Sequence, residues 1–310
     1  MKHPLPVALA GVSVIMCLAA ALAGQLGVAQ YSHLVHFRAR RRLPAAAAAP
    51  PAERPLPRSM VGVAAQAVKV WDGQTRVDAS LSVSYISMAK PVPAAFMRWA
   101  EIKADGARPI IEILPHGHSL QSITRGRMDG WFRALKAEIN EPVVISFGPE
   151  ANGTWYTWAG HPAQFRTAWR HVWHVLGRRD ITWLWQMSSR RPLTGYWPGQ
   201  HYVTWAGVDG YLERPSDTFS NRFGEALAAV RTITRAPIVV SETAVGPRTG
   251  HQAAGIRNLF AGARRRHVIG VVWFDQRQSG SLAHQDWQLS PGTAAMAAFR
   301  SAAAAFLRAG

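Results

Sequence analysis

Short apolar runs rich in Val, Ile and Trp alternate along most of the chain with segments of helical periodicity. The runs that predict strands are residues 61–65, 83–88, 109–114, 142–147, 181–187, 205–211, 237–242 and 269–274. Between them lie amphipathic stretches, such as 128–139 and 163–176, that predict helices. This alternation predicts a parallel sheet with crossover helices, and eight strands over about 250 residues favour a closed (β/α)8 (TIM) barrel over an open sheet.

The N-terminal pattern is different. Residues 7–29 are almost entirely apolar and long enough to cross a bilayer as one helix. Lys2 supplies a short basic region, and Ala21-Leu22-Ala23 resembles a signal-peptidase site. Residues 1–30 are therefore predicted to be either a cleaved signal peptide or a membrane anchor. The arginines at 38 and 40–42 would place that flank in the cytoplasm by the positive-inside tendency.

Residues 31–58 are basic and rich in Ala and Pro, which predicts an extended, disordered linker. The barrel domain is expected to span residues 59–310. The single cysteine, Cys17, precedes this domain, so the domain can form no disulfide and no cysteine-based zinc site.

The formal net charge is +17, which attracts anionic partners of many kinds. The residues before Ser59 hold seven Lys and Arg against Glu53, a charge of +6, so +11 belongs to the predicted domain. Because the basic residues are scattered and no nucleic-acid motif is present, we expect no nucleic-acid partner.

Two carboxylates come at the ends of predicted strands. Glu150 follows run 142–147 and Glu242 ends run 237–242. In a closed parallel barrel all strands open at their carboxyl ends onto one face, so these side chains are predicted to face each other. Two opposed carboxylates suit glycosidic bond hydrolysis, in which one donates a proton and the other attacks or activates water. The alternative is that each is an ordinary polar residue on the barrel rim.

Aromatic residues accompany both carboxylates. Trp155, Tyr156 and Trp158 follow Glu150, and Trp273 lies near the end of the last predicted strand. The apolar faces of sugar rings pack on indole rings. These aromatic neighbours therefore favour a carbohydrate site over the alternative that the two glutamates are ordinary polar residues on the barrel rim.

The segment Glu150-Ala-Asn-Gly-Thr-Trp-Tyr-Thr-Trp resembles the acid/base motif of glycoside hydrolase family 26, the β-mannanase-like enzymes. Residues 196–211 resemble that family's loop into strand six, and Ser241-Glu242 matches its nucleophile strand. The similarity extends over about residues 110 to 290, with the motifs in family order.

This resemblance implies a retaining mechanism, with Glu150 as acid/base and Glu242 as nucleophile, about 5–5.5 Å apart. It also implies a hydrogen bond from Tyr211 to the nucleophile. The residues expected to contact sugar are Asn152, Trp155, Tyr156, Tyr211, Trp273, His116 and His118. Since no third ligand is evident beside the two histidines, no metal and no cofactor are expected.

The chain departs from the family pattern around these glutamates. Pro149 replaces the histidine that usually precedes the acid/base, and Gln186-Met187-Ser188 replaces a Ser-Pro-Asn.

Glu112, within the third predicted strand, would point into the barrel or toward its helices, and inside it would need a partner such as Arg or His.

The function expected from the sequence is hydrolysis of a β-linked polysaccharide, such as a β-mannan or β-glucan, with retention. A non-catalytic carbohydrate-binding barrel and a transglycosylase are the alternatives. Because such polymers lie outside the cytoplasm, we expect an extracytoplasmic monomer that is secreted or held at the membrane by residues 1–30.

Overall fold

The computed structural model describes residues 59–65, 67–278 and 285–309. The predicted signal or anchor (1–30) and linker (31–58) lie outside these residues. Within the described part of the chain, no helix has both the length and the apolar character needed to cross a membrane.

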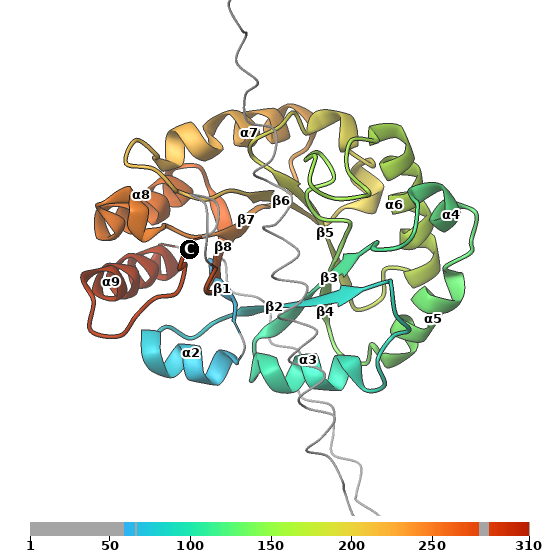
Figure 1. The fold of residues 1–310 in the computed structure, drawn as a ribbon, viewed down its shortest axis with the longest axis horizontal. Helices are drawn as coiled ribbons and strands as arrows, with labels where there is room; N and C mark the ends of the chain where they lie inside the picture. The colour runs from blue at the N-terminus through green and yellow to red at the C-terminus, as the bar shows by residue number, and fades with distance from the viewer. Residues whose placement is uncertain (1–58, 66, 279–284, 310) are drawn as a thin grey trace, which may run out of the picture.

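Eight parallel strands close into a barrel in sequence order, with β1 paired to β8 (Figure 1). They are β1 (Met60–Ala64), β2 (Leu81–Ser87), β3 (Arg108–Leu114), β4 (Val143–Phe147), β5 (Ile181–Ser188), β6 (Trp205–Asp209), β7 (Ile238–Thr243) and β8 (Val268–Phe274). The predicted barrel and all eight predicted strands are confirmed, with ends that differ by at most two residues.

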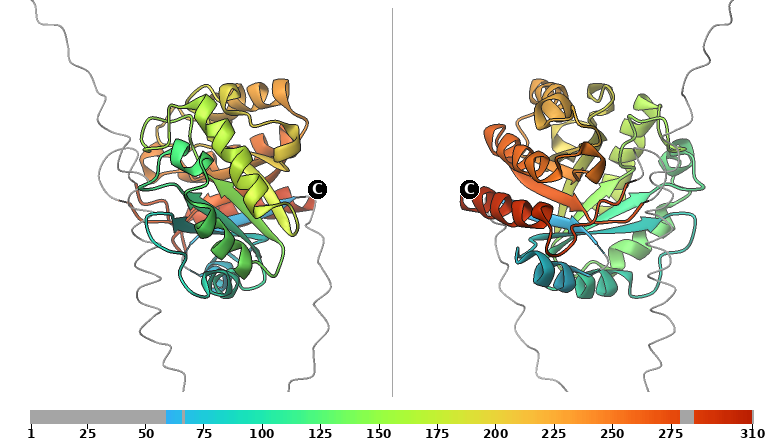
Figure 2. Two further views of the ribbon diagram at one scale, coloured as in Figure 1. Left: turned by 90° about the vertical axis from the view of Figure 1, so that its right-hand side faces the viewer. Right: turned by 60° about the vertical axis from the view of Figure 1, so that its left-hand side comes forward.

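Helices surround the strands as an outer layer (Figures 1 and 2). They are α2 (Val68–Thr75), α3 (Phe96–Ala104), α4 (Leu120–Thr124), α5 (Asp129–Glu138), α6 (Pro162–Leu176), α7 (Phe219–Ile233), α8 (Gln252–Arg265) and α9 (Ala294–Arg308). The connection from β5 to β6 has no α-helix; it holds the 3₁₀ turns η1 (Thr194–Tyr196) and η2 (Gln200–Tyr202).

The strands are buried on both faces, which explains their continuous apolar runs. All five residues of β4 are buried, for example. Aromatic side chains fill the layer between strands and helices: Phe147 of β4 contacts Phe165 and Trp169 of α6, and Trp169 contacts Trp183 of β5. The bulk of the aromatic content therefore stabilises the barrel wall.

Candidate active site

Glu150 lies on a sharp turn just beyond the carboxyl end of β4. Its φ of 52° is in the left-handed region, which is costly for a residue with a side chain, and Gly148 has a φ of 56°. The Glu150 backbone N–H donates to the Gln186 carbonyl of β5 at 3.0 Å, which holds the turn in place. Strained backbone of this kind is concentrated at functional sites.

Two indoles secure this turn. The Trp155 Nε1–H donates to Glu150 Oε2 at 2.8 Å, and Trp155 is half-buried. The Trp158 Nε1–H donates to the Pro149 carbonyl at 3.0 Å, and Trp158 is buried. Trp155 therefore contacts the Glu150 carboxylate directly, whereas Trp158 supports its backbone.

Tyr156 and His116 extend this aromatic group. The Tyr156 ring stacks on Trp158 with centroids 4.0 Å apart, and the half-buried His116 ring lies 5.1 Å from Trp158. His116 Nδ1 is 3.2 Å from the Ser87 hydroxyl, and burial lowers the pKa of His116. Both predicted sugar contacts thus lie beside the Glu150 turn.

Glu242, in β7, has each carboxylate oxygen bound by a tyrosine. Tyr211, two residues past β6, donates its hydroxyl to Oε1, the hydrogen bond that the resemblance implies. Tyr85 of β2 donates to Oε2 at 2.9 Å. The sequence analysis missed Tyr85; its only signal was a polar aromatic residue within a strand otherwise built of Leu, Ser, Val and Ile.

Burial and these hydroxyls act in opposite directions on Glu242. Burial raises the pKa of Glu242, and the hydrogen bonds from Tyr211 and Tyr85 lower it. Burial and the Glu242 charge raise the pKa of Tyr211 well above its ordinary value, so its hydroxyl stays protonated and able to donate. The two tyrosines therefore favour the ionised carboxylate that a nucleophile needs.

A buried polar chain lies within the barrel. The Gln186 amide donates to Glu112 Oε1 and to Asp209 Oδ2, both at 3.0 Å, and Ser241 donates to Asp209 Oδ1 at 2.6 Å. All four side chains are almost fully buried. Glu112 thus points into the barrel, as one of its two predicted orientations required, but its partner is an amide and not an Arg or His.

The four carboxyl groups influence one another. Burial, followed by the charges of Glu150, Glu242 and Glu112, raises the pKa of Asp209 well above its ordinary value. Burial and Glu242, with a further contribution from Glu150, raise the pKa of Glu112 well above its ordinary value. Glu150 and Glu242 lie at the carboxyl ends of β4 and β7, so the closed parallel barrel places both at the same end.

The pH dependence of stability tests this buried network of Glu112, Gln186, Asp209 and Ser241. The folded protein keeps the Glu112 proton at pH values where an unfolded chain has released it. The contribution of Glu112 to the free energy of unfolding therefore falls as pH rises above about 4.3. Glu112→Gln keeps an acceptor for Gln186 and does not titrate. We expect a melting temperature near wild type at about pH 5 and several degrees above wild type at about pH 9.

Thermal unfolding followed by circular dichroism across this range measures the effect. The exposed Glu141→Gln variant is the control for loss of a carboxylate outside the barrel. Parallel curves for wild type and Glu112→Gln would show that Glu112 does not hold its proton in the folded state.

The structure corrects the predicted role of Trp273. Its side chain is 0% exposed, packs on Phe299 of α9 at 5.2 Å between ring centroids, and donates to the Trp287 carbonyl at 3.2 Å. Side chains alternate between the two faces of a strand, so Trp273 points to the helices, while its neighbour Phe274 contacts Tyr211. Trp273 therefore lines no sugar subsite.

Asn152 and His118 also have roles other than sugar contact in this structure. The Asn152 amide donates to the Ser188 and Arg191 carbonyls at 2.8 and 3.1 Å, and its oxygen accepts from the Ser188 N–H at 2.9 Å. Asn152 is 5% exposed, and its amide joins the segments after β4 and β5. His118 Nε2 lies 3.0 Å from the Met88 carbonyl.

Residues 59–65, 67–278 and 285–309 contain no group of three His, Cys, Asp or Glu side chains that could hold a metal ion. The side chains brought together at this end of the barrel are two half-buried carboxylates, Glu150 and Glu242, with tyrosine and tryptophan donors.

Glutamates at the ends of β4 and β7 of a parallel (β/α)8 barrel fit the two-carboxylate chemistry of a glycosidase class of barrel. Consistent with this class, residues 117–243 match the profile of Glycosyl hydrolase family 26, an interval that contains both Glu150 and Glu242. This match confirms the family 26 resemblance that the sequence motifs indicate. No curated protein sequence matches the chain.

Solved structures with similar folds include several family 26 enzymes. An endo-β-1,4-mannanase from Cellulomonas fimi has a TM-score of 0.61 and 14% identity, covering 79% of this chain and 70% of that one. The Bacteroides ovatus β-mannanase BoMan26A has a TM-score of 0.60 and 15% identity, with coverage of 78% and 87%. A Podospora anserina β-(1,4)-mannanase has a TM-score of 0.55 and 13% identity, and the match spans 78% of this chain but only 60% of that one. At these identities the similarity establishes the fold alone.

Proposed function

We propose that this protein is a retaining glycoside hydrolase that cleaves a β-linked polysaccharide outside the cytoplasm. The observation that carries this proposal is the different environment of the two glutamates. Glu242 receives two tyrosine hydroxyls, one on each oxygen, whereas Glu150 receives the Trp155 indole N–H. Environments that differ in this way assign different protonation roles to two carboxyl groups of one site.

The reaction follows from these environments. The Glu242 carboxylate attacks the anomeric carbon, while Glu150 gives its proton to the departing glycosidic oxygen, so that a glycosyl–Glu242 ester forms. Glu150, now ionised, removes a proton from water, and the water oxygen attacks the same carbon. The ester bond breaks, Glu242 is again a carboxylate, Glu150 is again an acid, and the anomeric configuration is retained.

The polar surroundings favour a substrate preference different from that of the mannanases of similar fold. Pro149 offers no side-chain donor where the family motif has a histidine, and Gln186 is engaged by two buried acids. β-Mannan and β-glucan are both within the proposed range.

The test is a polymer panel. The full chain is incubated with β-mannan, mixed-linkage β-glucan, β-xylan and cellulose, new reducing ends are assayed, and the first-formed anomer is identified by NMR. We expect cleavage of at least one polymer, with the β-anomer formed first. An α-anomer as the first product would contradict the retaining mechanism. Binding of a polymer without cleavage would favour the carbohydrate-binding alternative.

A further inference from the structure

Gln186 is bonded to both sides of the candidate active site. It lies in β5, between β4, which leads to Glu150, and β6, which is the neighbour of the Glu242 strand β7. Its backbone carbonyl accepts the Glu150 N–H at 3.0 Å, and its side-chain amide donates to Asp209 of β6 at 3.0 Å. One residue therefore contacts both the Glu150 turn and the strand beside Glu242.

Asp209 continues this connection to Glu242. Asp209 and Glu242 are register partners across β6 and β7, and the Gly210 N–H donates to the Glu242 carbonyl at 3.0 Å. Ser241, the residue before Glu242, donates its hydroxyl to Asp209 Oδ1 at 2.6 Å. The Asp209 carboxyl group thus binds Gln186 through one oxygen and the sequence neighbour of Glu242 through the other.

The same amide also reaches the other side of β4. Gln186 Nε2 donates at 3.0 Å to Glu112 Oε1 of β3, which is the second neighbour of β4 in the barrel. A primary amide has two N–H groups, so it can donate one to each carboxyl group, which a hydroxyl cannot do. These two hydrogen bonds, here named the amide bridge, join Gln186 to Glu112 and Asp209 and connect both neighbours of β4 to β6.

The amide bridge is not explained by packing. Gln186, Glu112 and Asp209 are 2% exposed or less. Gln186 Oε1 is buried and has no hydrogen-bond partner in the part of the chain that the structure describes, an arrangement that lowers stability. An apolar side chain of the same length would avoid this loss but could not join the two acids. The position of Gln186 is therefore better explained by its connections than by its contribution to the core.

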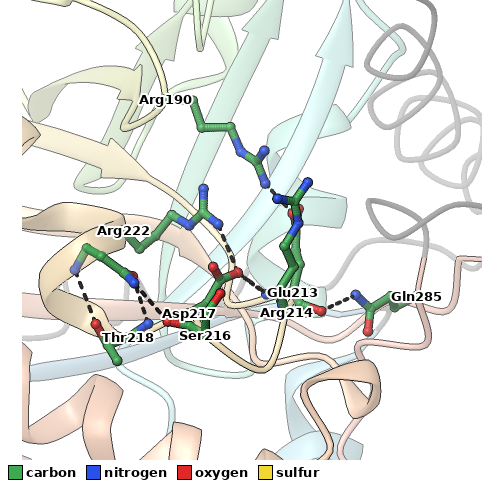
Figure 3. A network of polar contacts seen from close by, with 9 residues as sticks. Arg190, Glu213, Arg214, Ser216, Asp217, Thr218, Arg222 and Gln285 are labelled. Carbon is green, nitrogen blue, oxygen red and sulfur yellow. Dashed lines mark hydrogen bonds and ion pairs between the residues drawn. The ribbon is translucent and has the colours of Figure 1, made fainter. Parts of the chain in front are cut away.

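A separate network connects the segments beyond the ends of β5 and β6. Figure 3 shows the buried Glu213, which follows β6, paired with Arg190, which follows β5. Asp217 accepts the Glu213 and Arg214 N–H groups at 2.8 and 3.0 Å. Loss of the Gln186 amide would leave this network in place, so we expect the barrel to fold without the amide bridge.

We propose that Gln186 is a positioning residue that fixes the separation of the Glu150 and Glu242 carboxyl groups. This inference rests on the proposed function for the roles of the two glutamates. A retaining pair works at about 5–5.5 Å, and a displacement of about 1 Å can cost about 100-fold in rate. The connection from the Glu150 turn through Gln186 and Asp209 to the Glu242 strand maintains this separation without contacting the sugar.

Three variants of the full chain test the amide bridge, with melting curves to show that each is folded. Gln186→Met keeps the length of the side chain and removes both donated hydrogen bonds. Asp209→Asn preserves the bridge, because it keeps an oxygen for Gln186 and gains an amide that can donate to Ser241. The control is Trp185→Phe. Trp185 is buried and donates to the Tyr196 carbonyl at 3.2 Å, but it alternates with Gln186 along β5 and so faces away from the barrel interior.

Kinetics on the cleaved polymer give the first measurement. We expect Gln186→Met to lower kcat about 10- to 100-fold with KM as in wild type, because only the geometry of the reacting groups changes. The loss should be smaller on an aryl glycoside with an activated leaving group, whose cleavage does not need Glu150 as acid. Asp209→Asn and Trp185→Phe should remain close to wild type on both substrates.

The second measurement does not depend on activity. The Trp155 Nε1–H donates to Glu150 Oε2 at 2.8 Å, so its NMR signal in protein with isotope-labelled tryptophan reports the position of Glu150. Trp155→Phe identifies the signal by its disappearance. We expect Gln186→Met to shift this signal and Trp185→Phe to leave it unchanged.

The outcomes separate the inference from the proposed function. Wild-type kcat and an unshifted Trp155 signal in Gln186→Met, or equal losses in Gln186→Met and Trp185→Phe, would overturn the inference and leave the hydrolase intact. A raised KM with unchanged kcat would assign Gln186 to sugar binding and overturn it as well. If the wild type cleaves no polymer, the hydrolase fails and the Trp155 signal decides the inference: a shift in Gln186→Met supports it, and an unshifted signal refutes it.

Discussion

Replacement of Glu242 by glutamine is expected to lower kcat by about 10³-fold or more on any polymer that the wild type cleaves, while the barrel stays folded. The amide cannot attack the anomeric carbon, so no glycosyl–enzyme ester forms. The glutamine fits the same space: one of the two tyrosine hydroxyls can still donate to its oxygen, and the other can accept from its amide N–H. Initial rates of reducing-end formation and the melting temperature measure the two effects.

Glu150→Gln should lose activity in a way that depends on the leaving group. Without an acid, cleavage of a natural glycosidic bond fails, but an aryl glycoside with an activated leaving group still reacts to form the ester with Glu242. Azide should then accelerate turnover by attacking that ester, since it needs no general base. Rescue of Glu150→Gln but not of Glu242→Gln on the activated substrate would assign the two roles, and rescue in the reverse order would exchange them. Glu141→Gln, an exposed control, should match wild type.

Truncation of Trp273 is expected to destabilise the fold without weakening sugar binding. Trp273 is fully buried against Phe299, so Trp273→Ala removes a large side chain from the layer between β8 and α9. The expected cost is about 3–5 kcal/mol of unfolding free energy, measured by denaturant titration.

The separate question of substrate contact needs a variant that stays folded. Trp273→Phe retains most of the packing and loses only the hydrogen bond to the Trp287 carbonyl. Its KM on the cleaved polymer should equal that of wild type. Trp155→Phe is the matched comparison, because it removes the indole N–H that contacts Glu150 and should alter kcat. A raised KM in Trp273→Phe with unchanged stability would restore the subsite interpretation.

Trp273 and Glu242 illustrate how far the sequence could be interpreted. A strand buried on both faces is an unbroken apolar run, so strand positions could be read along the chain, and with them the strand ends that carry Glu150 and Glu242. The same unbroken run has no alternation of polar and apolar residues, and therefore does not show which side chains face the barrel interior. For this reason the sequence alone does not distinguish Trp273, which faces the helices, from a residue that lines the site.

The sequence also does not show which distant polar side chains form hydrogen bonds with one another. Glu112 needed a partner inside the barrel, but Gln186 and Asp209 are neutral or acidic and are separated from it by 74 and 97 residues, positions that only closure of the barrel brings together. Asn152 likewise stands in the motif beside Trp155, yet the fold turns its amide to Ser188 and Arg191. The position of Asn152 in the motif indicated that the segment is functional. It did not indicate which side chains of the segment hold backbone in place instead of contacting sugar.

The left-handed backbone at Glu150 sets a limit on engineering this protein for heat resistance. A residue with a Cβ in that conformation costs of the order of 1 kcal/mol or more, which glycine would avoid. Any design procedure that scores folding free energy alone will therefore select against the glutamate at this position. Thermostabilised variants should be sought elsewhere in the barrel wall, with position 150 and its turn held constant.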